Sequence, residues 1–414
     1  MKNLHKLLII GTVWPEPNSS AAGSRMIQLI NLFLSEGFDV TFASTASESE
    51  FMFDLEHMGV KRQYIKLNCG SFDVFVSALQ PDIVLFDRFM IEEQFGWRVT
   101  EQCPNAVKVL DTEDLHCLRY CRQEAFKQGR EFNVYDLLEA DIAKREIASI
   151  YRCDISLIIS PYEMFLLKSL FNVDENLLFY LPFILPKITS TEQLNLKSYE
   201  QRKHFISIGN FLHEPNWNAV LYLKEEIWPL IKKQLPNTEL HVYGAYPSQK
   251  VFNLHNEKQG FIIKGRAENA NAVMQNAKVC LAPLRFGAGL KGKLIEAMQN
   301  GTPSVTTDIG AEAMHSNLPW NGFIANDKEA FANKAVKLYT DRGVWEKAVR
   351  NGFEILNTCY PVEHALLFIK KLKELKIELH SHRRKNFIGS LLNHNTMAAL
   401  KYMSKWIEEK NKKV

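Results

Sequence analysis

Two lysines and a glutamate lie close together in the chain, at Lys291, Lys293 and Glu296. They follow an apolar run and a loop with Gly287 and Gly289, which predicts a strand, a glycine loop and a helix that begins near Gly289. The free N–H groups of a first helical turn bind phosphate, and a carboxylate accepts hydrogen bonds from vicinal hydroxyls such as those of a ribose. This segment therefore predicts a site for a phosphorylated ligand that carries hydroxyl groups.

The two lysines are unfavourable at the start of a helix, where each opposes the helix dipole at a cost of about 0.3–1 kcal/mol. A bound dianion would reverse that cost. The competing hypothesis is that these side chains are solvated and that Lys293 and Glu296 form an ordinary ion pair. The coincidence of glycines, helix start and charges favours the ligand site.

Short apolar runs recur through the first half of the chain, each followed by a turn and a helical stretch. A strand that is apolar throughout is buried on both faces, as in parallel sheets covered by helices. The first half therefore predicts a doubly wound α/β domain. Its predicted strands cover residues 7–10, 40–43, 82–86, 106–110 and 155–159.

A second series of strands and helices follows a polar stretch, which predicts an interdomain linker at 187–203. The series predicts another parallel sheet. We expect domains at 1–186 and 204–360, with C-terminal helices over 361–414. The predicted strands of the second domain begin at residues 204, 239, 260, 278 and 304, and its predicted helices cover 216–233, 269–276 and 289–300.

Length and composition limit the classes of protein that remain. A chain of 414 residues fits two or three packed units. A net charge of +3 excludes the broad basic face of a nucleic-acid-binding protein, so any anion site must be local. The seven scattered cysteines indicate a reducing compartment, and the apolar run at residues 7–10 is too short for a signal peptide or a membrane span. We therefore expect a cytoplasmic protein.

The last thirty residues predict an amphipathic helix. Two hypotheses remain open: the helix packs back on the N-terminal domain, or it lies on the inner face of a membrane as a peripheral contact. Its apolar positions are Phe387, Ile388, Leu391, Leu392, Met397, Leu400, Met403 and Ile407.

The stretch FGAGLKGKLIEAMQNGTPSVTTDIGAEAM, residues 286–314, resembles the nucleotide-sugar signature of retaining GT-B glycosyltransferases of family 4, the glycosyl transferases group 1. The resemblance implies an α/β protein of GT-B fold, with two facing Rossmann-like domains, a cleft between them and a C-terminal helical tail. It also implies that the first domain holds the acceptor and the second holds the donor.

The resemblance gives residue roles in the second domain. Glu296 would hold the ribose, and Lys291 and Lys293 the diphosphate, with Lys293 also catalytic. Three positions depart from the family pattern: Ala288 stands where many relatives have a glutamate, and Asn210 and His213 stand near the places of an arginine and a lysine. Lys264 would lie near the base. The implied donor-binding set is Gly209, Asn210, Gly265, Arg266, Gly287, Ala288, Gly289, Leu290, Lys291, Lys293 and Glu296.

In the first domain, His116 is the match for a catalytic histidine beneath the donor sugar. The glycine-containing loop of the family is matched loosely at Ala22 and Gly23, with Arg25 in reach of phosphate. Polar residues after the strand at 106–110 add candidates, because ligands bind at the carboxyl ends of parallel strands. The candidates for the acceptor or the donor phosphate are Gly23, Arg25, Asp111, Asp114 and Arg119.

The function implied by the resemblance is transfer of a hexosyl or related group from a nucleotide-diphosphate sugar, with retention of configuration and without metal or cofactor. The acceptor would be a glycan, a lipid-linked sugar or a protein, in bacterial polysaccharide synthesis. Two alternatives remain: a nucleotide-sugar epimerase of GT-B fold and a non-catalytic GT-B partner subunit. These residues leave the sugar, the base, the acceptor and the oligomeric state open.

Overall fold

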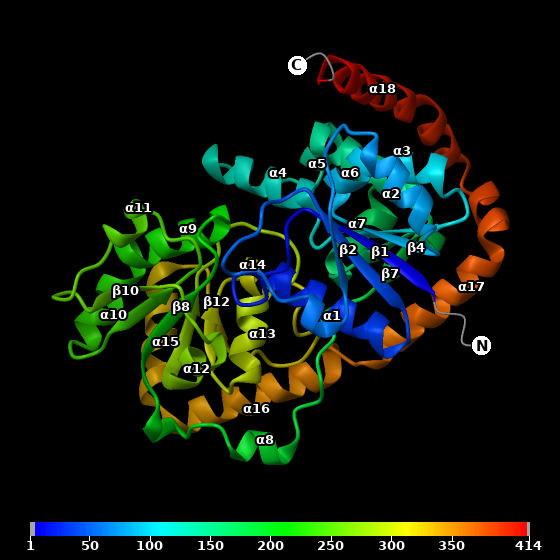
Figure 1. Ribbon diagram of the computed structural model, residues 1–414. Coiled ribbons are helices and arrows are strands. Elements are labelled where there is room, and N and C mark those ends of the chain that lie inside the picture. The colour runs from blue at the N-terminus through cyan, green and yellow to red at the C-terminus, as the bar shows by residue number, and fades with distance from the viewer. Residues whose placement is uncertain (1–4, 412–414) are drawn as a thin grey trace.

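The chain folds into two α/β halves, each built on its own parallel sheet (Figure 1). The computed structural model describes residues 5–411, without the side chains of residues 190 and 395–398. The predicted α/β architecture, with two Rossmann-like domains and C-terminal helices, is confirmed. Residues 1–4 and 412–414 of the predicted domains, and the side chain of Met397, lie outside the described residues.

The N-terminal half has a seven-stranded sheet in the order β3-β2-β1-β4-β5-β6-β7. Its central strands are apolar and buried on both faces, because helices cover both sides of the sheet. The strands are β1 (Lys6–Gly11), β2 (Asp39–Ser44), β3 (Lys61–Tyr64), β4 (Ile83–Asp87), β5 (Val107–Asp111), β6 (Ile155–Ile158) and β7 (Leu178–Tyr180). The helices are α1 (Ala21–Ser35), α2 (Ser71–Leu79), α3 (Phe89–Gln102), α4 (His116–Lys127), α5 (Asp136–Glu139), α6 (Asp141–Arg152) and α7 (Pro161–Ser169).

The apolar runs predicted five of these strands and missed the two at the edges, β3 and β7. An edge strand has a neighbour on one side only, so its sequence need not be apolar throughout. Strand β3 reads KRQY and has no fully buried residue.

The C-terminal half has a six-stranded sheet in the order β10-β9-β8-β11-β12-β13. The edge strand β13 was missed. The strands are β8 (Lys203–Ile208), β9 (Leu240–Tyr243), β10 (Phe261–Gly265), β11 (Ala277–Ala282), β12 (Ser304–Thr306) and β13 (Gly322–Ile324). The helices are α9 (Glu214–Tyr222), α10 (Trp228–Gln234), α11 (Gln249–Phe252), α12 (Ala270–Asn276), α13 (Gly292–Gln299), α14 (Asp308–Ala311), α15 (Lys328–Thr340) and α16 (Arg342–Cys359).

The single helix predicted over 216–233 is wrong in detail. A π-helical turn, Leu223–Ile227, separates α9 from α10. Pro229 in the first turn of α10 has no N–H to donate to the preceding turn, which accounts for the wider turn at this point.

The connection between the halves is more ordered than a polar linker. It contains α8 (Ser190–Leu194), and Lys203 already belongs to β8, so the predicted end of the linker at 203 is one residue late. Arg202 is buried because its guanidinium donates hydrogen bonds to the carbonyls of Lys197, Asn300 and Ala277 and to Thr302 Oγ1.

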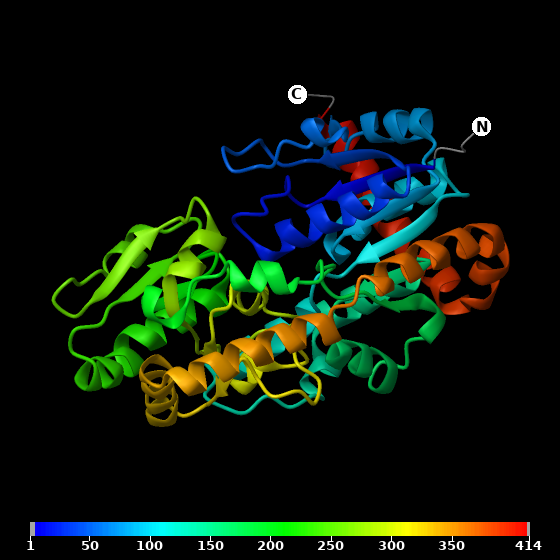
Figure 2. The same cartoon turned by 90° about the horizontal axis from the view of Figure 1, so that it is seen from below.

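The last two helices, α17 (Glu363–Lys385) and α18 (Phe387–Asn411), return to the N-terminal half (Figures 1 and 2). Phe368 of α17 joins the core formed by α1 and the sheet, with its ring centroid 6.1 Å from that of Phe33. Helix α18 packs against α3 and α6. Among the helices of residues 5–411, none is both long and apolar enough to cross a bilayer.

Candidate functional site

A cavity of about 450 Å³ lies between the two halves. Its walls are the loops that follow strands of both sheets, where α/β proteins bind their ligands. The N-terminal half contributes the segment 17–22 and Arg88, Glu113, Asp114, His116 and Arg119, and the C-terminal half contributes Gly209, Asn210, His213, Asn216 and most of the segment 284–296.

Two helices begin at this cavity, α1 and α13. Ser20 caps α1 by accepting a hydrogen bond from Gly23 N at 3.0 Å. The first turns of the two helices nearly touch, because a Cβ on Gly292 would lie 2.5 Å from the Cβ of Ala21. The partial positive charges of two helix N-termini therefore favour an anion in this part of the cavity.

Helix α13 begins at Gly292, three residues later than the sequence predicted. Gly289 has φ +63° and Gly287 φ +149°, values that keep the loop out of the helical conformation. Lys291 is then the N-cap, with extended backbone, and Lys293 lies in the first turn.

Both lysine side chains line the cavity, where Lys291 is buried and Lys293 is partly buried. Lys291 Nζ donates to the carbonyl oxygens of Gly289 at 2.6 Å and Ala288 at 3.1 Å, and Lys293 Nζ donates to Asn216 Oδ1 at 2.6 Å. Burial lowers the pKa of each lysine to about 8. Burial raises the pKa of Glu296 to about 7, and Lys293 opposes that shift.

The alternative of an ordinary Lys293–Glu296 ion pair is wrong. Within residues 5–411, neither Lys291 nor Lys293 has a carboxylate oxygen within 4.0 Å of its amine. One buried and one partly buried ammonium group, both hydrogen-bonded to neutral oxygens, are matched to an anionic ligand.

The loop after β8 supports Lys293 from the side. A Cβ on Gly209 would lie 2.8 Å from Lys293 Nζ and from the Asn216 side chain, so only glycine allows this approach. Asn216 Nδ2 also donates to the carbonyl of Asn210 at 2.9 Å. Burial lowers the pKa of His213 to about 4, with a further contribution from Arg119. Asn216 was missed from the sequence, although its position shortly after a strand was a usable signal.

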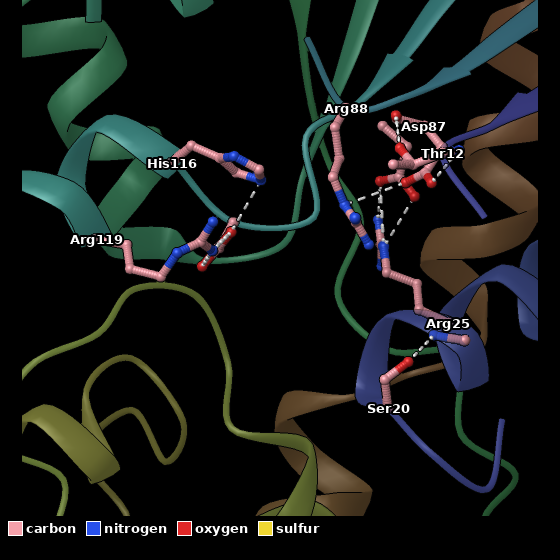
Figure 3. A network of polar contacts seen from close by, with 10 residues as sticks. Thr12, Ser20, Arg25, Asp87, Arg88, His116 and Arg119 are labelled. Carbon is pink, nitrogen blue, oxygen red and sulfur yellow. Dashed lines mark hydrogen bonds and ion pairs between the residues drawn. The ribbon is translucent and has the colours of Figure 1, made fainter. Parts of the chain in front are cut away.

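His116 and Arg119 approach the cavity from α4 and meet at Asp114 (Figure 3). His116 Nε2 lies 3.6 Å from Asp114 Oδ1, and Arg119 forms an ion pair with the same carboxylate. Burial lowers the pKa of His116 to about 4 although Asp114 opposes the shift. The imidazole is therefore neutral at neutral pH.

Arg88 and Glu113 also line the cavity, and neither was predicted. Arg88 has φ +73°, and its Nε lies 3.4 Å from Asp87 Oδ1, while Asp87 Oδ2 accepts from Thr12 N at 3.0 Å (Figure 3). Glu113 has φ +62°, and its buried Oε1 has no hydrogen-bond partner among the described atoms. Burial and then Asp111 raise its pKa to about 8. Each residue follows closely on the carboxyl end of a strand, β4 or β5, which was the available signal.

The predicted role of Arg25 and Asp111 at the ligand site is wrong. Both side chains are at most 1% exposed and form an ion pair, with Arg25 Nη2 3.0 Å from Asp111 Oδ1. Arg25 Nη1 also donates to the carbonyls of Leu181 and Pro182. Arg25 points inward because it lies on the face of α1 that packs on the sheet, and its three guanidinium nitrogens all donate within the N-terminal half.

Four further predicted residues lie outside the main cavity. Gly23 packs against the backbone of Glu16 and lines a neighbouring cavity of about 180 Å³ instead. Ala267 lines the cavity, whereas Gly265 and Arg266 do not. The Arg266 guanidinium is instead stacked on Phe51, 3.9 Å from its ring centroid. Lys264 is exposed on β10.

The loop at 287–289 is attached to the N-terminal half. Gly289 N donates to Glu163 Oε1 at 2.9 Å, and Arg122 donates to the Gly287 carbonyl at 2.8 Å and to both oxygens of Glu312 at 2.8 and 2.6 Å. Ala288 is buried in the apolar core of the N-terminal half. Ala288, which stands where many relatives have a glutamate, therefore lies in a loop of the C-terminal half that also contacts the N-terminal half.

The described residues contain no group of three or more His, Cys, Asp or Glu side chains placed to hold a metal ion. All seven cysteines are free thiols. Cys117 and Cys121 are buried in the core of the N-terminal half.

Comparison with known proteins agrees with this architecture. Solved structures match over 90% or more of the chain: sucrose-phosphate synthase from Thermosynechococcus elongatus (16% identity, 90% of this chain and 99% of that one, TM-score 0.64) and a glycosyltransferase from Rickettsia africae (12%, 90% and 99%, 0.63). Anabaena HepE in complex with UDP and glucose is 13% identical, and the match covers 91% of this chain and 100% of that one with a TM-score of 0.62. The protein has the GT-B fold.

The sequence of the C-terminal half of this GT-B protein carries a further likeness. Residues 202–341 match the family model described as glycosyl transferases group 1. An uncharacterized 44.6 kDa protein in the cps region of Klebsiella pneumoniae is 22% identical over 160 residues, which is 37% of this chain. The match spans about two fifths of that relative, 41% of its length.

Proposed function

We propose that this GT-B protein is a glycosyltransferase that moves a hexosyl or related group from a nucleotide-diphosphate sugar to an acceptor, with retention of configuration. The observation that carries the proposal is the pair of lysine ammonium groups at the start of α13, of which Lys291 is buried and Lys293 is partly buried. Together with Glu296 they offer charge for a diphosphate and an acceptor of hydrogen bonds for a ribose. The segment lies within the stretch that matches the group 1 model.

In this proposal the residues at the start of α13 stabilise the leaving diphosphate. The bond between the anomeric carbon and the diphosphate oxygen breaks, and the acceptor oxygen bonds to the anomeric carbon on the same face. The acceptor proton passes to the leaving diphosphate, so no side-chain base is required and neither metal nor cofactor takes part. The developing charge is met by two cations and two helix N-termini. His116, neutral and held beside Asp114, supports the sugar from the other half.

We assign the acceptor side to Arg88 and Glu113. The left-handed backbone of each residue costs about 1–3 kcal/mol, a strain that is commonly found at ligand sites. The carboxyl group of Glu113, which lines the cavity, suits a hydroxyl of a glycan, a lipid-linked sugar or a protein side chain. A cytoplasmic location agrees with the seven free thiols.

The first test is a thermal-shift panel of UDP-, GDP-, ADP- and dTDP-sugars, followed by transfer assays with the donor that binds. A ligand at 100 times its dissociation constant raises stability by about 2.7 kcal/mol. Lys293→Ala and Glu296→Ala should abolish the shift, and Lys337→Ala, at an exposed lysine of α15, should leave it unchanged.

The outcomes separate the alternatives. Transfer with the anomeric configuration kept, measured by NMR and insensitive to a chelator, supports the proposal. An epimerised sugar formed from the donor alone would support the epimerase, and donor binding without any turnover would support a partner subunit. Binding that survives both variants would overturn the placement of the donor.

A further inference from the structure

Helix α18 presents two different long faces, and only one of them is packed. Arg98 of α3 donates to Ser404 Oγ at 2.9 Å and forms an ion pair with Glu408. At the other end, Asn386 Nδ2 donates to the carbonyl of Tyr151 on α6 at 2.7 Å. The inner face is therefore anchored on the N-terminal half near both ends of the helix.

The outward side of α18 carries large apolar side chains. Phe387 and Leu391 lie one turn apart, as do Tyr402 and Trp406, so each pair lies on one side of the helix. Side chains this large and this exposed are unusual when they gather on one helix of a folded protein. The α18 outer face consists of Phe387, Ile388, Leu391, Tyr402, Met403 and Trp406, which are 48–74% exposed.

Basic side chains border the α18 outer face at both ends. Arg384 and Lys385 are exposed where α17 meets α18, and Lys405 and Lys410 are exposed near the C-terminal end. Lys410 Nζ lies 5.4 Å from the ring centroid of Trp406. The acidic residue on this outer side is Glu409, because Glu408 faces Arg98. The border of the apolar face is therefore net positive.

We propose that the α18 outer face binds the surface of a membrane that contains anionic lipids. The helix would lie in the plane of the headgroups, with Phe387, Ile388, Leu391 and Trp406 in the acyl boundary and the lysines at the phosphates. Tryptophan and tyrosine favour this depth, since one edge of each ring is polar. This proposal goes beyond the proposed function and does not depend on it.

The composition of the face favours lipid over a second copy of the chain. Protein–protein interfaces are depleted in lysine, whereas helices that lie on anionic membranes combine lysine with aromatic side chains. In Figure 1, α18 lies at the outer edge of the N-terminal half, away from the C-terminal half, so a flat surface can reach it.

The test is flotation of the full-length protein with vesicles of phosphatidylcholine alone or mixed equally with phosphatidylglycerol. The double variant Phe387→Glu, Trp406→Glu should reduce binding to the mixed vesicles by on the order of tenfold or more, because two large apolar groups are lost and two negative charges gained. The matched control is Leu194→Glu on α8, where the leucine is 84% exposed at the opposite side of the molecule (Figure 1).

We expect the wild type and Leu194→Glu to float with the mixed vesicles, with weaker binding in high salt and to phosphatidylcholine alone. Circular dichroism and thermal melting should be the same for all three proteins. The proposal is wrong if the folded double variant floats as the wild type does, or if the wild type does not float. A wild-type dimer that the double variant converts to a monomer would place a second copy on this face and would also overturn it.

Discussion

Donor binding should be coupled to proton exchange: the complex should release protons on balance at pH 7 and take up protons on balance at pH 8. In the unliganded cavity, burial places the pKa of Lys291 and Lys293 at about 8 and that of Glu296 at about 7. A bound diphosphate favours both ammonium forms, so the lysines take up protons. A ribose that donates hydrogen bonds favours the carboxylate form of Glu296, so this residue releases a proton.

The size of the effect follows from these pKa values. At pH 8 each lysine is about half protonated, so the two take up about one proton while Glu296 releases about 0.1. At pH 7 the lysines take up about 0.2 and Glu296 releases about 0.5, which leaves a net release of about 0.3. Donor affinity should fall about twofold from pH 7 to pH 8 and about fiftyfold from pH 7 to pH 9.

Calorimetric titration with a nucleotide sugar measures the exchange directly, because the diphosphate diester has no proton that titrates near neutrality. The slope of the binding enthalpy against the ionisation enthalpy of the buffer, phosphate or Tris, gives the number of protons. Lys291→Arg should reduce the uptake at pH 8 by about half a proton, since a guanidinium stays charged. Lys337→Arg should change nothing.

The reasoning is refuted if the donor binds at pH 8 with an enthalpy that does not depend on the buffer. It is also refuted if the uptake at pH 8 is the same in Lys291→Arg as in the wild type. Either result would mean that the cations at the start of α13 are not neutralised by the donor diphosphate.

Three further substitutions test the site and its support. Gly209→Ala should weaken donor binding about tenfold, because it places a methyl group 2.8 Å from Lys293 Nζ. The control Gly343→Ala, whose Cβ meets no atom closer than 3.5 Å, should leave donor affinity unchanged. Equal donor affinities of the two variants would contradict this prediction. Arg25→Met should lower the free energy of unfolding in urea by about 3–5 kcal/mol because it leaves Asp111 buried and unpaired, whereas Arg130→Met, at an exposed pair, should change it by less than about 1 kcal/mol. Arg122→Ala should lower kcat/KM of the transfer reaction about tenfold or more, because the loop at 287–289 loses its attachment to the Arg122 guanidinium of the N-terminal half. An unchanged kcat/KM would show that the loop does not need this attachment.

The sequence predicted the architecture because burial on both faces imposes continuous apolar runs on central parallel strands. The edge strand β3 was missed because its sequence, KRQY, is polar, and β7 and β13 were missed because each has only three residues. The start of α13 was placed three residues early because the positive φ of Gly289, which delays the helix, depends on contacts with the other half. The spacing of Lys291, Lys293 and Glu296 was readable because the three lie along one short stretch of chain.

The rest of the site depended on partners that are distant in sequence. Arg25 resembled a phosphate ligand until Asp111, 86 residues away, proved to be its counter-ion inside the core. Arg88 and Glu113 were missed because their strained backbone, which turns each toward the cavity, is fixed by surrounding packing.

The sequence by itself determined two parallel sheets and one local cluster of charge, since both follow from the chemistry of neighbouring residues. Only the tertiary structure decided which charged groups are neutralised inside the protein and which face a ligand. The same holds for the tail, whose amphipathic pattern was evident from the sequence. The fold showed that α18 packs on the N-terminal half and still leaves an apolar face outside, because a helix has two sides and the domain covers one.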